Sequence, residues 1–156
     1  MSRITPFLWF DTQAEEAARF YVSIFRNSRI LSVTRNERAA GAPAESVFPV
    51  EFELEGQPFT ALNGGPVFHF NPAISLFVHC ADQAEVDAYW EALSAGGEKG
   101  QCGWLTDRYG LSWQIVPDRL GELMQGEPAK AAAMTQAMLK MTKLDVAELQ
   151  RAYDAG

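Results

Sequence analysis

Two stretches of the chain repeat one pattern of apolar and polar positions at an offset of 70 residues, from Ile4 to Ile74. Each stretch starts with a short apolar run typical of a strand, continues with a residue that can cap a helix, and ends with apolar residues at helical spacing. The matched pairs are Phe7 with Phe77, Leu8 with Val78, Phe10 with Cys80, Thr12 with Asp82, Glu15 with Glu85, and Phe20 with Trp90. The repeat predicts two copies of one supersecondary unit with a ligand cleft between them.

In the first copy, Thr12 and Glu15 form a capping-box pattern, in which a hydroxyl and a carboxylate satisfy free N–H groups at a helix start. Asn36–Ser46 is rich in Ala, Gly and Pro and predicts a loop, and Glu55-Gly56 predicts a hairpin turn. The expected regular elements are a strand over Ile4–Phe10, a helix ending near Phe25, a strand over Ile30–Arg35, and hairpin strands over Val47–Leu54 and Pro58–Asn63.

Asn63-Gly64-Gly65-Pro66 marks the boundary between the copies, because this run does not fit regular structure. The second copy is expected to hold a strand over Ile74–Cys80, a helix capped by Asp82 and stopped by Gly96-Gly97, strands over Gly103–Thr106 and Leu111–Val116, and the turn Asp107–Gly110 between them. After Pro117 the pattern is helical, with one helix from Pro128 to near Met141 and one capped by Asp145 that runs through Tyr153.

The predicted architecture is therefore α+β: two βαβββ modules, followed by C-terminal helices. We place the paired modules in residues 1–117, at about 1–63 and 72–117, and the helical extension in residues 118–156. Met134, Met138 and Met141 form an apolar stripe at helical spacing, which is typical of a packed face. The pattern leaves open whether the stripe packs on this chain or on a partner subunit.

The chain has 156 residues, a formal net charge of -7, and no cluster of Lys or Arg. This charge argues against nucleic acid and membrane partners, because phosphate binding needs concentrated positive charge. No apolar run approaches a bilayer span, and the first residues do not resemble a signal peptide, so we expect a cytoplasmic protein. Of the two cysteines, Cys80 is expected to face the core.

Alternation along the opening strands divides their side chains between two faces. Thr5, Phe7 and Trp9 share one face of the first strand, and Ser75, Phe77 and His79 share the matching face of the other. This mixture of aromatic and polar groups is typical of a ligand site, although the aromatic rings could equally fill a core.

Several longer motifs resemble the PhnB-like proteins, whose family is described as 3-demethylubiquinone-9 3-methyltransferase, within the vicinal oxygen chelate superfamily of glyoxalases, bleomycin-resistance proteins and dioxygenases. The motifs cover nearly the whole chain and are Pro6–Asp11, Glu16–Tyr21, Asn63–Pro66, Phe70–Leu76, Asp107–Gln114 and Ala137–Asp145.

The resemblance implies four side-chain positions at which metal-dependent relatives hold a divalent ion. Carried over by motif, these are Thr5, Asn63, Ser75 and Gln114. Neutral hydroxyls and amides are weak ligands for transition metals, so we expect no metal, no cofactor and no catalytic residue here. The expected ligand-binding cleft consists of Thr5, Phe7, Trp9, Asn63, Ser75, Phe77, His79, Trp104 and Gln114.

Three functions remain open at this point. The first is a metal-independent protein that binds a small molecule, and the second is a lyase or dioxygenase with a degenerate metal site, in which His79 acts as ligand or base. The third is a mainly structural role, since the resemblance also implies a homodimer. Methyl transfer is not supported, because a common S-adenosylmethionine site follows a strand with a Gly-rich turn, whereas Phe10-Asp11-Thr12 contains no glycine.

Overall fold

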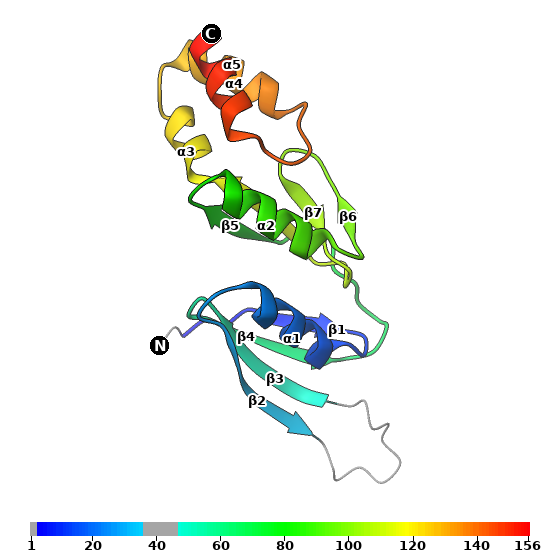
Figure 1. Ribbon diagram of the computed structural model, residues 1–156. Coiled ribbons are helices and arrows are strands. Elements are labelled where there is room, and N and C mark those ends of the chain that lie inside the picture. The colour runs from blue at the N-terminus through cyan, green and yellow to red at the C-terminus, as the bar shows by residue number, and fades with distance from the viewer. Residues whose placement is uncertain (1–2, 36–46) are drawn as a thin grey trace. The chain divides into compact units, whose positions relative to one another are not determined.

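The chain folds into two compact units, Met1–Phe70 (unit 1) and Asn71–Gly156 (unit 2), in a computed structural model that describes residues 3–35 and 47–156 (Figure 1). The loop expected over Asn36–Ser46 lies outside the described residues. The predicted α+β class and the two βαβββ modules are confirmed.

Unit 1 contains a four-stranded sheet in the order β1-β4-β3-β2. Its elements are β1 (Phe7–Phe10), α1 (Ala14–Ile24), β2 (Arg29–Arg35), β3 (Val47–Leu54) and β4 (Gln57–Asn63). β1 runs parallel to β4, and the other neighbours are antiparallel. The predicted hairpin turn is confirmed, because Glu55 and Gly56 both have positive φ, at 47° and 83°, as a type I′ turn requires.

α1 packs against one face of this sheet and buries the residues that alternate toward it. The buried positions include Leu8, Phe10, Ala17, Ala18, Tyr21, Val50, Phe52 and Ala61. The ring centroids of Tyr21 and Phe52 lie 6.4 Å apart, which joins the helix to the centre of the sheet. Burial of this apolar surface is the main favourable contribution to the folding of unit 1.

Two expectations for the start of unit 1 were wrong. Ile4 lies outside β1 and is 81% exposed, because Pro6 has no N–H group with which to extend the strand ladder. Thr12 does not cap α1, whose N-cap residue is Gln13 and makes no side-chain capping bond. Instead, the N–H of Ala14 donates to Oδ1 of Asn63 at 2.8 Å, so the end of β4 supplies the acceptor.

Unit 2 repeats the topology of unit 1 in a sheet of order β5-β8-β7-β6. Its elements are β5 (Ser75–Cys80), α2 (Gln83–Ser94), β6 (Glu98–Lys99), β7 (Trp104–Thr106) and β8 (Ser112–Pro117). The predicted cap of α2 is confirmed, since Asp82 Oδ1 accepts from the N–H of Glu85 at 2.9 Å. The sequence pattern does not predict β6, because its two residues are polar and exposed and show no apolar alternation.

The C-terminal extension consists of α3 (Asp118–Met124), α4 (Pro128–Met138) and α5 (Val146–Ala155). Asp145 caps α5 as predicted, accepting from the N–H of Glu148 at 3.0 Å. α4 ends before the expected Met141, because the N–H groups of Lys140 and Met141 bond to carbonyls three residues back, as in a tightened turn.

The methionine stripe packs on this chain. Met134 is fully buried in a cluster with Val116, Leu123, Leu144 and Leu149, and Met138 and Met141 pack partly buried against the same cluster. Val116 belongs to β8, so this cluster joins the extension to the sheet of unit 2. None of the helices described here is long and apolar enough to cross a bilayer.

One buried carboxylate, that of Asp107, fixes the turn between β7 and β8. Its Oδ1 atom accepts from the N–H groups of Tyr109 and Leu111, at 2.8 and 3.1 Å. Its Oδ2 atom accepts from the indole N–H of Trp113 at 2.8 Å. Because Asp107 and Trp113 are each only 2% exposed, water cannot replace these bonds without opening the fold.

Replacing Asp107 with asparagine keeps the shape of the side chain but places an amide N–H2 group against one of these donors. We expect Asp107→Asn to lower the free energy of unfolding by about 2 kcal/mol, measured by urea denaturation. Asp11→Asn, which changes an exposed carboxylate, should alter stability by less than about 0.5 kcal/mol. Equal stability of the two variants would contradict the role assigned to Asp107.

Candidate functional site

The face of the unit 1 sheet opposite α1 (the open face of unit 1) carries Phe7 and Trp9. Phe7 is 57% exposed and Trp9 is half-buried, so the alternation expected for β1 is observed. The indole N–H of Trp9 donates to the carbonyl of Gly65 at 3.0 Å. The ring of Phe68 meets the indole edge to face, with centroids 5.1 Å apart and planes at 77°.

The segment from Gly64 to Phe70 is part of unit 1. The N–H groups of Gly64 and Gly65 donate to the carbonyls of Phe10 and Asp11, at 2.8 and 3.2 Å, so the segment continues along the end of β1. Phe70 also packs edge to face on Phe10, at 5.2 Å between centroids. Gly64 lies so close to Trp9 that an added Cβ would overlap the indole ring.

The other two site residues expected in unit 1 do not join Phe7 and Trp9 within β1. Asn63 pairs in register with Phe10, whose side chain is buried, and its side chain accepts from the start of α1. Leu62, the register partner of Trp9, occupies the open face at this point of β4. Thr5 precedes β1 and is exposed.

The corresponding open face of unit 2, opposite α2, carries one row of expected site residues across three strands. Gln114 of β8 is the register partner of Phe77 in β5 and of Trp104 in β7. Its Nε2 atom donates to the hydroxyl of Ser75 at 2.9 Å. The row therefore places a neutral amide between two aromatic residues, and Phe77 is 46% exposed.

His79 extends this face toward the C-terminal extension. Its ring centroid lies 4.8 Å from that of Phe77, and its Nδ1 atom lies 3.9 Å from Oδ1 of Asp118. The side chains of His79 and Asp118 are 76% and 55% exposed, so solvent screens any attraction between them.

The four positions that the resemblance assigns to a metal do not fit one. Ser75 and Gln114 bond to each other, Asn63 accepts from a helix start, and none of the four side chains carries a charge. Within residues 3–35 and 47–156, no group of three or more His, Cys, Asp or Glu is arranged to hold a metal ion. Burial raises the pKa of the Cys80 thiol to about 12, so this buried cysteine stays protonated near neutral pH.

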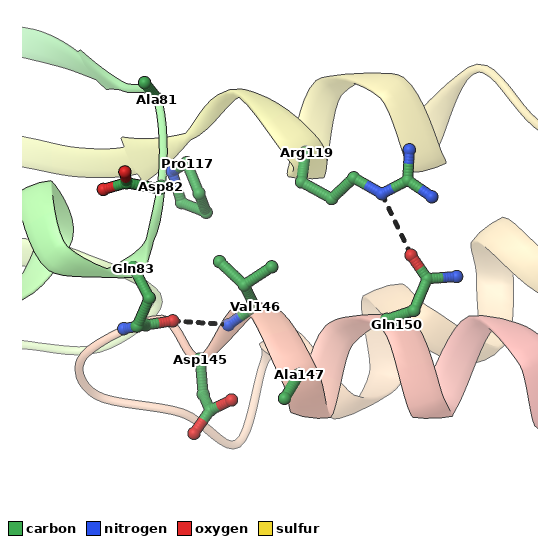
Figure 2. Close-up of a pocket in the computed structure, with 9 residues that line it drawn as sticks. All are labelled: Ala81, Asp82, Gln83, Pro117, Arg119, Asp145, Val146, Ala147 and Gln150. Atoms are coloured by element: carbon green, nitrogen blue, oxygen red, sulfur yellow. Dashed lines mark hydrogen bonds between the residues drawn. The ribbon is translucent and has the colours of Figure 1, made fainter.

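A pocket of about 720 Å³ lies where the extension meets the start of α2. Figure 2 shows Pro117 and Val146 facing each other in it, with Arg119 and Gln150 at one end. Most of its hydrogen-bonding side chains are already engaged. Gln83 accepts from the N–H of Val146 at 2.7 Å and donates to the carbonyl of Leu144 at 3.1 Å. Arg119 donates to Gln150 at 2.9 Å.

The family model described as 3-demethylubiquinone-9 3-methyltransferase matches residues 2–116. The chain belongs to this family. The PhnB protein from Bacillus cereus, whose structure is solved, is 34% identical, with a TM-score of 0.69 over 74% of this chain and 99% of that one.

Two further solved structures are similar to the chain at lower identity. Protein PA1353 from Pseudomonas aeruginosa is 17% identical, with a TM-score of 0.64 over 75% of this chain and 98% of that chain. A glyoxylase/bleomycin resistance protein/dioxygenase domain from Frankia sp. EAN1pec is 15% identical, with a TM-score of 0.45 over 72% and 94% of the two chains. No curated protein matches the chain.

The methyltransferase name of the family does not fit the residues of this member. Each described sheet pairs only its first and last strands in parallel, and a helix follows β1 after Asp11-Thr12-Gln13, without a glycine. A doubly wound parallel sheet with a Gly-rich turn, which cradles S-adenosylmethionine in the common type of methyltransferase, is not formed by the described residues.

Sequence reasoning missed Phe68 as a candidate contact residue. The available signal was the run Gly64-Gly65-Pro66, which predicts that the chain reverses sharply after β4. Such a reversal can return the following residues to the sheet that the chain has just left, here to the neighbouring strand β1. The pattern alone does not identify Trp9 as the side chain that they meet.

Gly64→Ala should displace the indole of Trp9, because the new methyl group occupies the space of the ring. We expect the Trp9 indole N–H signal to shift in ¹H–¹⁵N spectra and stability to fall by about 1–3 kcal/mol. Gly121→Ala is the matched control, since nothing lies within 4 Å of its added Cβ in helix α3. An unchanged Trp9 signal in Gly64→Ala would show that the loop does not fix the indole.

Proposed function

We propose that this protein binds a small organic molecule on the open face of a sheet and does so without a resident metal ion. The observation that carries the proposal is the row Phe77–Gln114–Trp104, in which an amide bonded to Ser75 lies between two aromatic residues. Phe7 and Phe77 support it, because rings more than 40% exposed do not fill a core within their own units.

The ligand class follows from the groups on these faces. Indole and phenyl rings supply flat apolar surface, and Ser75 with Gln114 supplies neutral donors and acceptors. A charged ligand would lose hydration without gaining an opposite charge from these groups. We therefore infer an uncharged or weakly polar ligand with an aromatic or amphipathic body.

A catalytic alternative rests on His79. Its imidazole lies on the open face of unit 2, and Asp118 lies 3.9 Å from its Nδ1 atom. In this alternative the protein is a lyase- or dioxygenase-type enzyme with a degenerate metal site. His79 would then act as a general base or as a metal ligand.

We also propose that the protein is a cytoplasmic homodimer. Cytoplasmic residence is supported by the two cysteines, which are both free thiols. Dimer formation is supported by apolar side chains left exposed on the extension, Met124 at 50% and Leu139 at 53%. Met134 does not contribute to such a surface, since it is buried within the chain's own cluster.

The dimer proposal predicts that Leu139→Glu, a charge placed in an exposed apolar contact, shifts the mass in solution toward that of the monomer. The mass is measured by light scattering at several concentrations. Lys140→Glu, a charge change at the next, already polar position, is the control and should leave the mass unchanged. A monomeric wild type would remove this part of the proposal.

The binding proposal predicts that Phe77→Ala and Gln114→Ala each weaken a ligand found by screening neutral aromatic compounds, by about 3- to 30-fold. Calorimetry measures affinity, and denaturation measures stability separately, since Phe77 is 46% exposed and should contribute little to folding. Met124→Ala, on the extension, should leave affinity unchanged. A stoichiometric transition metal in protein purified without a His-tag would instead favour the catalytic alternative, a lyase- or dioxygenase-type enzyme.

A further inference from the structure

We propose that Phe68 is a ligand-contacting residue that forms, with Trp9, a corner selective for planar aromatic rings. The proposal rests on the proposed binding function and adds to it a residue outside the repeated strands. Its basis is the edge-to-face contact of the two rings, whose planes meet at 77°. Two flat surfaces at nearly a right angle can accept a flat ring against one surface with its edge against the other.

The indole side of the corner is held in place from two directions. Its N–H donates to Gly65, and Gly64 lies against the ring with no room for a side chain. Because this N–H is already used, Trp9 offers a ligand the surface of its ring and not a hydrogen bond. A neutral aromatic body suits such a surface better than a polar head group.

The phenyl side is supported by the backbone of its own segment. Gly64 and Gly65 bond to the end of β1, and Phe70 packs on Phe10 beyond Phe68. Phe68 is nevertheless 62% exposed, so most of its ring surface is free to be covered. A ligand that covers this ring buries apolar surface that remains exposed in the folded chain, and this burial favours binding.

Phe7 adds a third ring to the same sheet face. It lies two residues before Trp9 in β1, so the two side chains project to one side, and it is 57% exposed. Val67, beside Phe68 in the chain, is 70% exposed and carries no aromatic ring. Val67 therefore serves as a control position within the same segment.

The test uses the full chain with two probes, 2-naphthol and its saturated counterpart decahydro-2-naphthol. Binding is followed through the Trp9 indole N–H signal, which is assigned with Trp9→Phe. Trp90 and Trp113 are each 2% exposed and provide internal references. We expect 2-naphthol to shift the Trp9 signal and to bind more tightly than the saturated probe, because only the planar ring fits the corner.

Phe68→Ala should weaken 2-naphthol by about 3- to 10-fold and leave the saturated probe nearly unchanged. Phe68→Tyr, which keeps the ring, and Val67→Ala should each stay within about twofold of the wild type. A purely structural role for Phe68 would instead lower stability and weaken both probes alike, which would overturn the proposal. Denaturation of each variant separates a folding defect from a loss of affinity.

The outcomes distinguish this proposal from the binding function on which it rests. Undiminished 2-naphthol affinity in Phe68→Ala, together with a loss in Trp9→Ala or Phe7→Ala, removes Phe68 but keeps the binding function. Undiminished affinity in all three variants contradicts both. Failure of 2-naphthol to bind the wild type overturns the assigned ligand class, while the screen of neutral compounds still tests binding in general.

Discussion

Parallel pairing between the first and last strands of each unit is the constraint on which the remaining structure depends. β1 lies beside β4 and β5 beside β8, although a helix and two further strands separate them along the chain. This pairing brings Gln114 within hydrogen-bonding distance of Ser75, 39 residues away. In unit 1 it brings the end of β4 to the start of α1, where Asn63 accepts from Ala14.

Much of this could be predicted because it follows from local alternation. The burial of Leu8 and Phe10, and of Val78 and Cys80, follows from strand parity, and the Glu55-Gly56 turn follows from the backbone freedom of Gly56. The repeat at an offset of 70 positions, from Ile4 to Ile74, indicated the doubled topology. The family resemblance, carried by longer motifs, agrees with the matched family model.

The rest depended on contacts that are distant in sequence. Thr12 is a residue type that often caps helices. Asn63 nevertheless accepts the bond from the N–H of Ala14, because β4 ends beside the helix start. The motif match placed Asn63 among the cleft residues, and the local pattern does not show its contact with the start of the helix. Phe68 follows a glycine-rich reversal, and only the folded chain shows that the reversal returns it to Trp9.

The side chain of Gln83 gives the extension a role beyond that of a simple tail. It bridges the carbonyl of Leu144 and the N–H of Val146, while the N–H groups of Cys102 and Gly103 bond to the carbonyls of Met141 and Thr142. The match to the family model ends at Val116, and the extension buries the side chain of this residue. A chain cut at that boundary would leave these backbone donors without their partners and expose the apolar surface that the helices cover, so we expect unit 2 and its helices to unfold together.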